Sequence, residues 1–135
     1  MYSIEQVDFG YKLTFEGFIE TDEMKDWLSE SEKVLENTTL EEFGVFVDMR
    51  KLYPLPPESR AIMEEGQKLY KTKKMIRSVV IVANIVTQLQ FIRIAKETGI
   101  YEWERYIDAS SVANWEQVGL DWIIDGKDPD KKKRS

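Results

Sequence analysis

A set of polar and aromatic side chains follows the predicted strands of this chain, and these residues are the best placed to do chemistry. They are Asp48, Arg50, Tyr53, Ser59, Asn84, Asp108 and Ser110. In an α/β sheet, ligands bind just beyond the carboxyl ends of the strands, so these residues mark the expected working edge. Carboxylates, a guanidinium and hydroxyl groups at such an edge predict the binding of a partner or a small ligand.

Two serines of this set lie near predicted helix N-termini, where a phosphate group would be stabilised electrostatically. Ser59 is therefore a possible phosphoacceptor, and Ser110 occupies a similar position. The simpler interpretation, which we favour, is that both serines cap those helices. In the same way, Asp48 and Asp108 would each hold a neighbouring loop through its backbone N–H groups.

The sequence contains no cysteine and no histidine. Disulfides, thiol nucleophiles and cysteine-type zinc sites are therefore excluded, and so are the usual general base and a Ser-His-Asp arrangement. No glycine-rich phosphate loop occurs, and the stretch 125–128 lacks the spaced oxygen ligands of a calcium loop. We expect a protein that is not an enzyme and that has no metal and no cofactor.

The charge of the chain argues against nucleic-acid binding. Nineteen basic and 25 acidic residues give a net charge of −6, and residues 131–134 hold four of the positive charges. The body, 1–130, thus has 15 basic against 25 acidic residues, a net charge of −10. Such a body repels phosphate backbones and anionic lipid. We expect residues 126–135 to be a disordered tail and residues 1–125 to be one domain.

The apolar runs of the chain are too short for a bilayer span, and Met1 leads directly into a strand pattern. Both observations predict a soluble, cytoplasmic protein.

Five runs have the pattern of β-strands. They cover 2–7, 11–19, 43–49, 78–83 and 104–108. The first two are joined through Gly10 as a hairpin. Tyr11, Leu13 and Phe15 alternate with polar residues, which predicts an outer strand with one wet face. The runs at 43–49 and 78–83 are almost wholly apolar, which predicts inner strands covered on both faces.

Four segments between or after these strands have helical spacing. Expected starts are a cap at Thr21, the prolines Pro56-Pro57, a cap at Asn84, and a cap at Ser110 or Ser111. The order is β-β-α-β-α-β-α-β-α, which predicts a single-domain, layered α/β fold with a mixed, mostly parallel sheet. Gly66 lies in the inner stripe of the second helix and predicts a close approach of that helix to the sheet.

The third helix, between Asn84 and the natural stop at Gly99, is apolar on several sides. Ile85, Leu89 and Ile92 form one stripe, whereas Phe91 and Ile94 extend the apolar surface beyond it. Burial under neighbouring helices, a homodimer interface at Phe91 and Ile94, and a ligand groove beside them all remain open.

Three segments together resemble the SpoIIAA-like proteins of the STAS/SEC14-like group. They are FVDMR, RSVVIVAN and ERYIDASSVANWEQVGLDWI, and the resemblance covers nearly the whole chain. In the anti-sigma-factor antagonists of this group, a D-S-S-G segment begins the helix after the strand that matches 43–48, and its serine or threonine is phosphorylated. This chain has residues 54–59 there, with Ser59 loosely in place of the phosphoacceptor. The SEC14 side of the resemblance implies a lipid or another apolar ligand.

We therefore expect a non-enzymatic protein-interaction or ligand-sensing module in a bacterial cytoplasm. It would present the edge from Asp48 to Ser59 to a protein partner, and a small anion, a nucleotide or phosphorylation would tune that contact. The alternative function is a small carrier of a lipid or another apolar ligand, in the space beside Phe91, Ile94 and the tryptophans. A homodimer through the third helix is the remaining expectation.

Overall fold

The computed structural model of this chain describes residues 1–131. Its elements follow the predicted order, with a short 3₁₀ helix, η1, added before the last strand. In chain order they are β1 (Tyr2–Val7), β2 (Gly10–Gly17), α1 (Thr21–Glu36), β3 (Phe43–Leu52), α2 (Pro57–Thr72), β4 (Met75–Val82), α3 (Ile85–Thr98), η1 (Ile100–Glu102), β5 (Glu104–Asp108) and α4 (Trp115–Asp125).

The strands form one mixed sheet in the order β1-β2-β3-β4-β5. β1 and β2 are antiparallel because a two-residue turn joins them, with Tyr2 opposite Phe15 and Val7 opposite Gly10. β2 to β5 are parallel because a helix connects each to the next. The predicted α/β architecture is confirmed.

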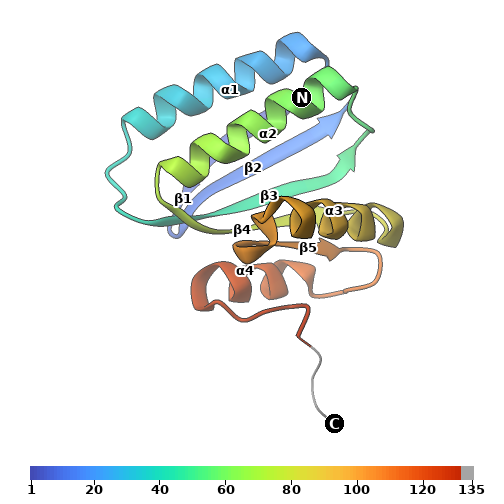
Figure 1. Ribbon diagram of the computed structural model, residues 1–135. Helices are drawn as coiled ribbons and strands as arrows, with labels where there is room; N and C mark the ends of the chain where they lie inside the picture. Colours follow the sequence, from blue (N-terminus) through green and yellow to red (C-terminus); the bar gives the residue numbers. More distant parts are fainter. Residues whose placement is uncertain (132–135) are drawn as a thin grey trace.

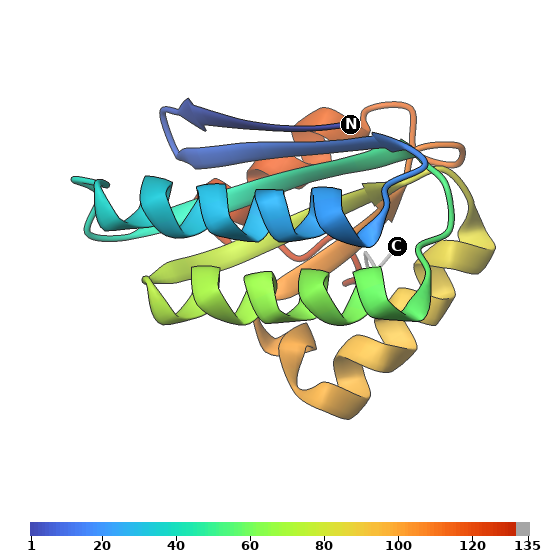
Figure 2. The same ribbon diagram turned by 90° about the horizontal axis from the view of Figure 1, so that it is seen from above.

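The helices cover the two faces of the sheet unequally. α1, α2 and α3 lie on one face, and α4 lies on the other (Figures 1 and 2). β3 and β4 are therefore buried on both sides, which explains their continuous apolar runs. α4 packs on β3, β4 and β5, whereas β2 buries Tyr11, Leu13 and Phe15 toward the helices and alternates with half-buried polar residues, as expected.

Two apolar clusters correspond to these faces. The larger one lies under α1, α2 and α3 and includes Trp27, Tyr70 and Val80. The smaller one lies under α4 and includes Phe46, Ile107 and Trp122. β3 continues three residues beyond the predicted end at Met49, because Lys51 and Leu52 pair with the end of β2.

Three predicted helix caps are wrong, and one is confirmed. Ser59 does not cap α2, because the residue before that helix is Pro56 and Ser59 lies in its first turn. The residue before α1 is Glu20, so Thr21 already lies in the first turn. α4 begins after Asn114 rather than at Ser110 or Ser111, because those serines donate their hydroxyls to Asp108 and form a turn instead. Asn84 does cap α3, since its Oδ1 accepts from the backbone N–H of Thr87 at 2.8 Å.

α3 ends as predicted, with Gly99 in the left-handed conformation at φ +85°. Among residues 1–131, every helix falls short of the length and apolar character that a membrane span requires.

The chain after α4 has contacts that the prediction of a disordered tail at 126–135 did not include. Asp128 and Asp130 pair with Arg105 on β5. The last part of that predicted tail, 132–135, lies outside the described residues.

Candidate functional site

The carboxyl ends of β2, β3 and β4 lead into α1, α2 and α3 at one edge of the sheet (Figure 2). Tyr53 follows β3 directly, Asn84 precedes α3, and Asp108 is the last residue of β5. Asp48 lies inside β3, opposite Thr14 of β2 and Ile81 of β4. The predicted site residues thus lie at this edge or near the carboxyl ends of the strands that form it.

Asp48 and Arg50 form an ion pair with two-point geometry near this edge. Oδ1 of Asp48 accepts from the backbone N–H and from Nε of Arg50, both at 3.0 Å, and Oδ2 accepts from Nη2 at 2.9 Å. The guanidinium carbon of Arg50 lies 4.2 Å from the ring centre of Trp115. The pair fixes the end of β3 against the start of α4, and hydrogen bonds within the chain occupy both carboxylate oxygens of Asp48.

Burial alone would raise the pKa of the Asp48 carboxyl. Hydrogen bonds from the side chain and backbone of Arg50, together with the charges of Arg50 and Lys12, outweigh burial and hold this pKa below its usual value. Asp48 is therefore ionised at neutral pH. Such a group is a poor general acid, but it is an effective structural anchor.

Asp108 organises the turn after β5. Its Oδ1 accepts from the backbone N–H of Ser110 at 2.9 Å and from the Ser110 hydroxyl at 2.6 Å, and its Oδ2 accepts from Ser111 at 2.7 Å. The hydroxyls of Ser110 and Ser111 and the Ser110 N–H lower the pKa of Asp108. Asp108 therefore holds a neighbouring loop, which is the simpler of its two predicted roles.

The structure does not bring the two aspartates together. Asp48 has the same orientation as Phe46, which packs under α4, because side chains alternate along a strand. Asp108 is adjacent to Ile107, which also packs under α4, so Asp108 faces the opposite side of the sheet. The predicted set is therefore divided between two faces.

The hydroxyl of Ser59 lies in the first turn of α2 and is fully buried. It lies 3.4 Å from the hydroxyl of Thr21, at the start of α1. A kinase could reach Ser59 only if the start of α2 moved away from α1. The placement of Ser59 thus gives no support to its predicted role as phosphoacceptor.

The two residues of the predicted interface on α3 are partly covered by the domain itself. Phe91 and Ile94 are half-buried, and the ring of Phe91 packs edge-on against Tyr106 at 5.5 Å. Ile85 and Leu89, predicted to form one apolar stripe with Ile92, are exposed together with Val86. Because α3 is apolar on several sides, its periodicity could not show which side faces the sheet.

Large apolar side chains are exposed near the ends of β2 and β3 and on the first two turns of α3, and the sequence did not predict this group. We call it the edge group: Met1, Phe18, Tyr53, Ile85, Val86 and Leu89. Met1 belongs here because its carbonyl accepts from the backbone N–H of Glu16 near the end of β2. The other large exposed apolar residues among 1–131, Ile76 and Ile124, lie at the start of β4 and near the end of α4. The sequence did contain one indication of an exposed apolar side chain here, since Phe18 directly follows the alternating run of β2.

Part of the edge group lines a broad, open recess. Phe18, Tyr53 and Met1 form its apolar part, and Arg50, Lys51 and Glu16 contribute charged side chains. Two predicted site residues, Arg50 and Tyr53, therefore do come together here.

A second space lies inside the fold, beneath α1 and α2. Its volume is about 20 Å³, which is room for about one water molecule. Its walls are apolar apart from Gln67, Ser78 and Glu104. A drug-sized apolar ligand needs several hundred Å³, so this conformation does not hold one at that place.

Glu104 is a fully buried carboxyl group beside this space. Burial raises its pKa, and hydrogen bonds from Tyr106 and from the Ser78 hydroxyl, the latter at 2.7 Å, offset only part of that effect. No group of three or more potential metal-ligating side chains occurs within the described residues.

Neither a protein-family model nor a curated protein sequence matches this chain. A solved structure does match, an uncharacterised protein of the DUF3478 family from Shewanella loihica PV-4 that is described as having a SpoIIAA-like fold. The TM-score is 0.60 at 14% identity, over 91% of this chain and 92% of the other. The fold is SpoIIAA-like. The similarity predicted from the sequence is thus confirmed for the fold, and the SpoIIAA-like fold by itself assigns no activity.

Proposed function

We propose that this chain is a non-enzymatic, regulatory protein-interaction module that binds a protein partner through the carboxyl edge of its SpoIIAA-like sheet. The observation that carries the proposal is the edge group. Exposed fractions reach 58% for Phe18, 62% for Tyr53, 62% for Val86 and 59% for Leu89. Clustered, exposed apolar side chains on a small domain are typical of a protein-binding surface.

The composition of the recess supports a protein partner. Aromatic residues are enriched at the centres of protein interfaces, and polar side chains form their rims. Phe18 and Tyr53 supply the first feature, and Arg50, Lys51 and Glu16 supply the second. Because Arg50 is paired with Asp48, Lys51 is the basic residue of the recess that favours acidic groups around an apolar partner surface.

Two observations support a non-enzymatic role. The sequence lacks histidine and cysteine, and the two best-placed carboxylates, Asp48 and Asp108, lie on opposite faces and are each occupied by internal hydrogen bonds. A small anion near Lys51 remains the proposed means of tuning the contact. If the partner is a second copy of this chain, the same proposal gives a homodimer.

The alternative function, a carrier of a lipid or another apolar ligand, has one observation in its favour. The walls of the internal space beneath α1 and α2 are almost wholly apolar. Its volume of about 20 Å³ would have to increase by an order of magnitude, so α2 would have to move away from the sheet. Native mass spectrometry of the untagged protein distinguishes the cases, since a carrier retains a bound mass.

The test of the main proposal compares matched surface variants in co-purification from the source organism. Val86→Ser with Leu89→Ser removes edge apolar surface, and Ile124→Ser removes a similar side chain, 55% exposed, near the end of α4. The proposal predicts a protein that is retained by the wild type and by Ile124→Ser but lost from the edge variant, and that binds the purified wild-type chain directly. Equal retention by the wild type and by both variants would contradict it.

A further inference from the structure

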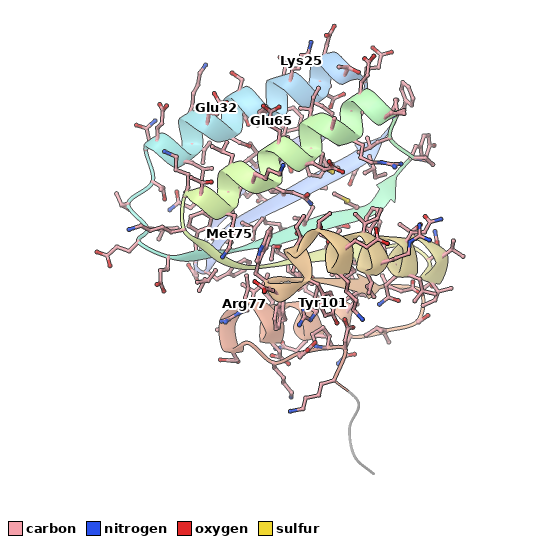
Figure 3. The ribbon with its side chains drawn as sticks, in the orientation of Figure 1. Lys25, Glu32, Glu65, Met75, Arg77 and Tyr101 are labelled. Atoms are coloured by element: carbon pink, nitrogen blue, oxygen red, sulfur yellow. The ribbon has the colours of Figure 1, made fainter. Side chains whose placement is uncertain are left out.

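Arg105 on β5 has a side chain that is largely buried between two aromatic rings. The guanidinium carbon lies 3.8 Å from the ring centre of Tyr101 and 4.4 Å from that of Trp122. The side chain is only 9% exposed. Tyr101 belongs to η1, just before β5, and is labelled in Figure 3.

The body of the domain fixes the orientation of this guanidinium. Nη1 donates to the backbone carbonyl of Tyr101 and, at 3.0 Å, to that of Glu104. The indole of Trp122 is itself fixed, since its Nε1 donates to the carbonyl of Ser78 at 2.9 Å. We call residues 126–131 the C-terminal segment. Residues that precede this segment bind Nη1 of Arg105, whereas Nε and Nη2 point away from the body of the domain.

The outward edge of Arg105 is occupied by the chain's own acidic segment. Nε donates to Oδ1 of Asp128 at 2.9 Å, and Nη2 donates to Oδ2 at 3.2 Å, which is the two-point geometry typical of an arginine and a carboxylate. A second carboxylate, that of Asp130, accepts from the hydroxyl of Tyr101 and lies 3.9 Å from Nε of Arg105. The site therefore recognises two carboxylates separated by one residue.

Within the described part of the segment, the backbone contributes little to its attachment. The N–H of Lys127 donates to Asp121 at the end of α4, and the N–H of Lys131 donates to Asp128 inside the segment. The N–H of Asp130 likewise donates to the Asp128 side chain. The hydrogen bonds and ion pairs that residues 128–131 make with β5 and η1 therefore come from the two carboxylates.

We propose that Arg105, Tyr101 and Trp122 form a binding site for an acidic peptide segment of another protein chain, and that Asp128-Pro129-Asp130 occupies this site in the isolated chain. An incoming Asp-x-Asp segment would displace the chain's own segment and take over the same hydrogen bonds. A peptide is the expected occupant, because two carboxylates of one chain, separated by one residue, already make the hydrogen bonds that this site offers. This site is separate from the edge group and does not depend on the function proposed above.

The test uses the full chain with its own segment weakened. In the variant Asp128→Asn with Asp130→Asn, the Nε–H resonance of Arg105 and the indole N–H resonance of Trp122 are followed by NMR. The probe is a blocked peptide of residues 126–131, Gly-Lys-Asp-Pro-Asp-Lys, and the control peptide carries asparagine in place of both aspartates. We expect saturable shifts of both resonances with the acidic peptide and binding at least about tenfold weaker with the control peptide.

Two comparisons complete the test. The wild-type chain should require at least about tenfold more acidic peptide, because its own segment competes at high effective concentration. Adding Arg105→Lys to the double variant should abolish the difference between the peptides, because lysine lacks the two-point geometry. Equal binding of both peptides, or no saturable shift, would overturn the proposal. A double variant that failed to fold would do so as well, because the segment would then be an integral part of the fold.

Discussion

Gly66 on α2 lies directly against the indole of Trp27 on α1. A Cβ placed on Gly66 would be 2.2 Å from Cη2 and Cζ3 of that ring. The glycine therefore allows the two helices to approach each other, whereas the sequence analysis expected it to allow an approach of helix to sheet. Trp27 also stacks on Tyr70 of α2 at 6.2 Å, so this contact is a central part of the larger apolar cluster.

Gly66→Ala should therefore destabilise the protein, although alanine favours a helix. Displacing a buried indole costs about 2 kcal/mol or more, which exceeds the roughly 1 kcal/mol gained in helix propensity. The free energy of unfolding from urea titration measures the net loss, with Glu65→Ala as an exposed control on the same helix. A Gly66→Ala protein as stable as the control would show that α1 and α2 pack differently.

Asp48→Asn should reduce stability by about 1 kcal/mol at pH 7, a value that allows for the partial exposure of Arg50. The folded state lowers the pKa of Asp48, so its contribution is present above the unfolded-state pKa of about 3.9 and is lost as the pH falls through the folded-state value. The difference between variant and wild type should thus disappear in strong acid. Glu64→Gln, which changes an exposed carboxylate on α2, is the control. A difference that persists unchanged at low pH would show that the ion pair is not its cause.

Glu104→Gln should have the opposite pH dependence. The folded state raises the pKa of Glu104. The wild type therefore loses stability as the pH rises from the unfolded-state pKa of about 4.3 to the higher folded-state pKa. Glutamine keeps the shape and can still accept from Ser78. The variant should be the more stable protein at pH 7, and its advantage should shrink toward pH 4. Thermal unfolding across this range measures it, with Glu97→Gln on the exposed side of α3 as the control. An unchanged or lower stability at pH 7 would contradict the expectation.

The sequence predicted the element order and the two-sided burial of β3 and β4, because periodicity and continuous apolar runs report directly on layers. It could not predict the orientation of α3, since the side that carries Ile85 and Leu89 and the side that carries Phe91 are both apolar. It also placed Ser59 at an accessible edge, whereas the contact with Thr21 buries it. That burial depends on how two helices meet, which no local pattern records.

The sequence named two residues that line the recess, Arg50 and Tyr53, and the role of that edge stays a prediction. It missed Phe18 and Val86 because exposure of an apolar side chain depends on what the rest of the fold leaves uncovered. The pairing of Arg105 with Asp128 was missed for a related reason, since it joins a strand to a segment 23 residues later that has no regular structure.

The most direct test of the proposed function is a calorimetric titration of the purified partner into the wild-type chain, Leu89→Ser and Ile124→Ser. The account predicts that Leu89→Ser weakens binding by about tenfold or more, because exposed apolar anchors carry most of an interface's energy, while Ile124→Ser binds as the wild type does. Equal affinity for all three chains would show that the partner binds elsewhere, and the carboxyl edge would then not be the working surface of this protein.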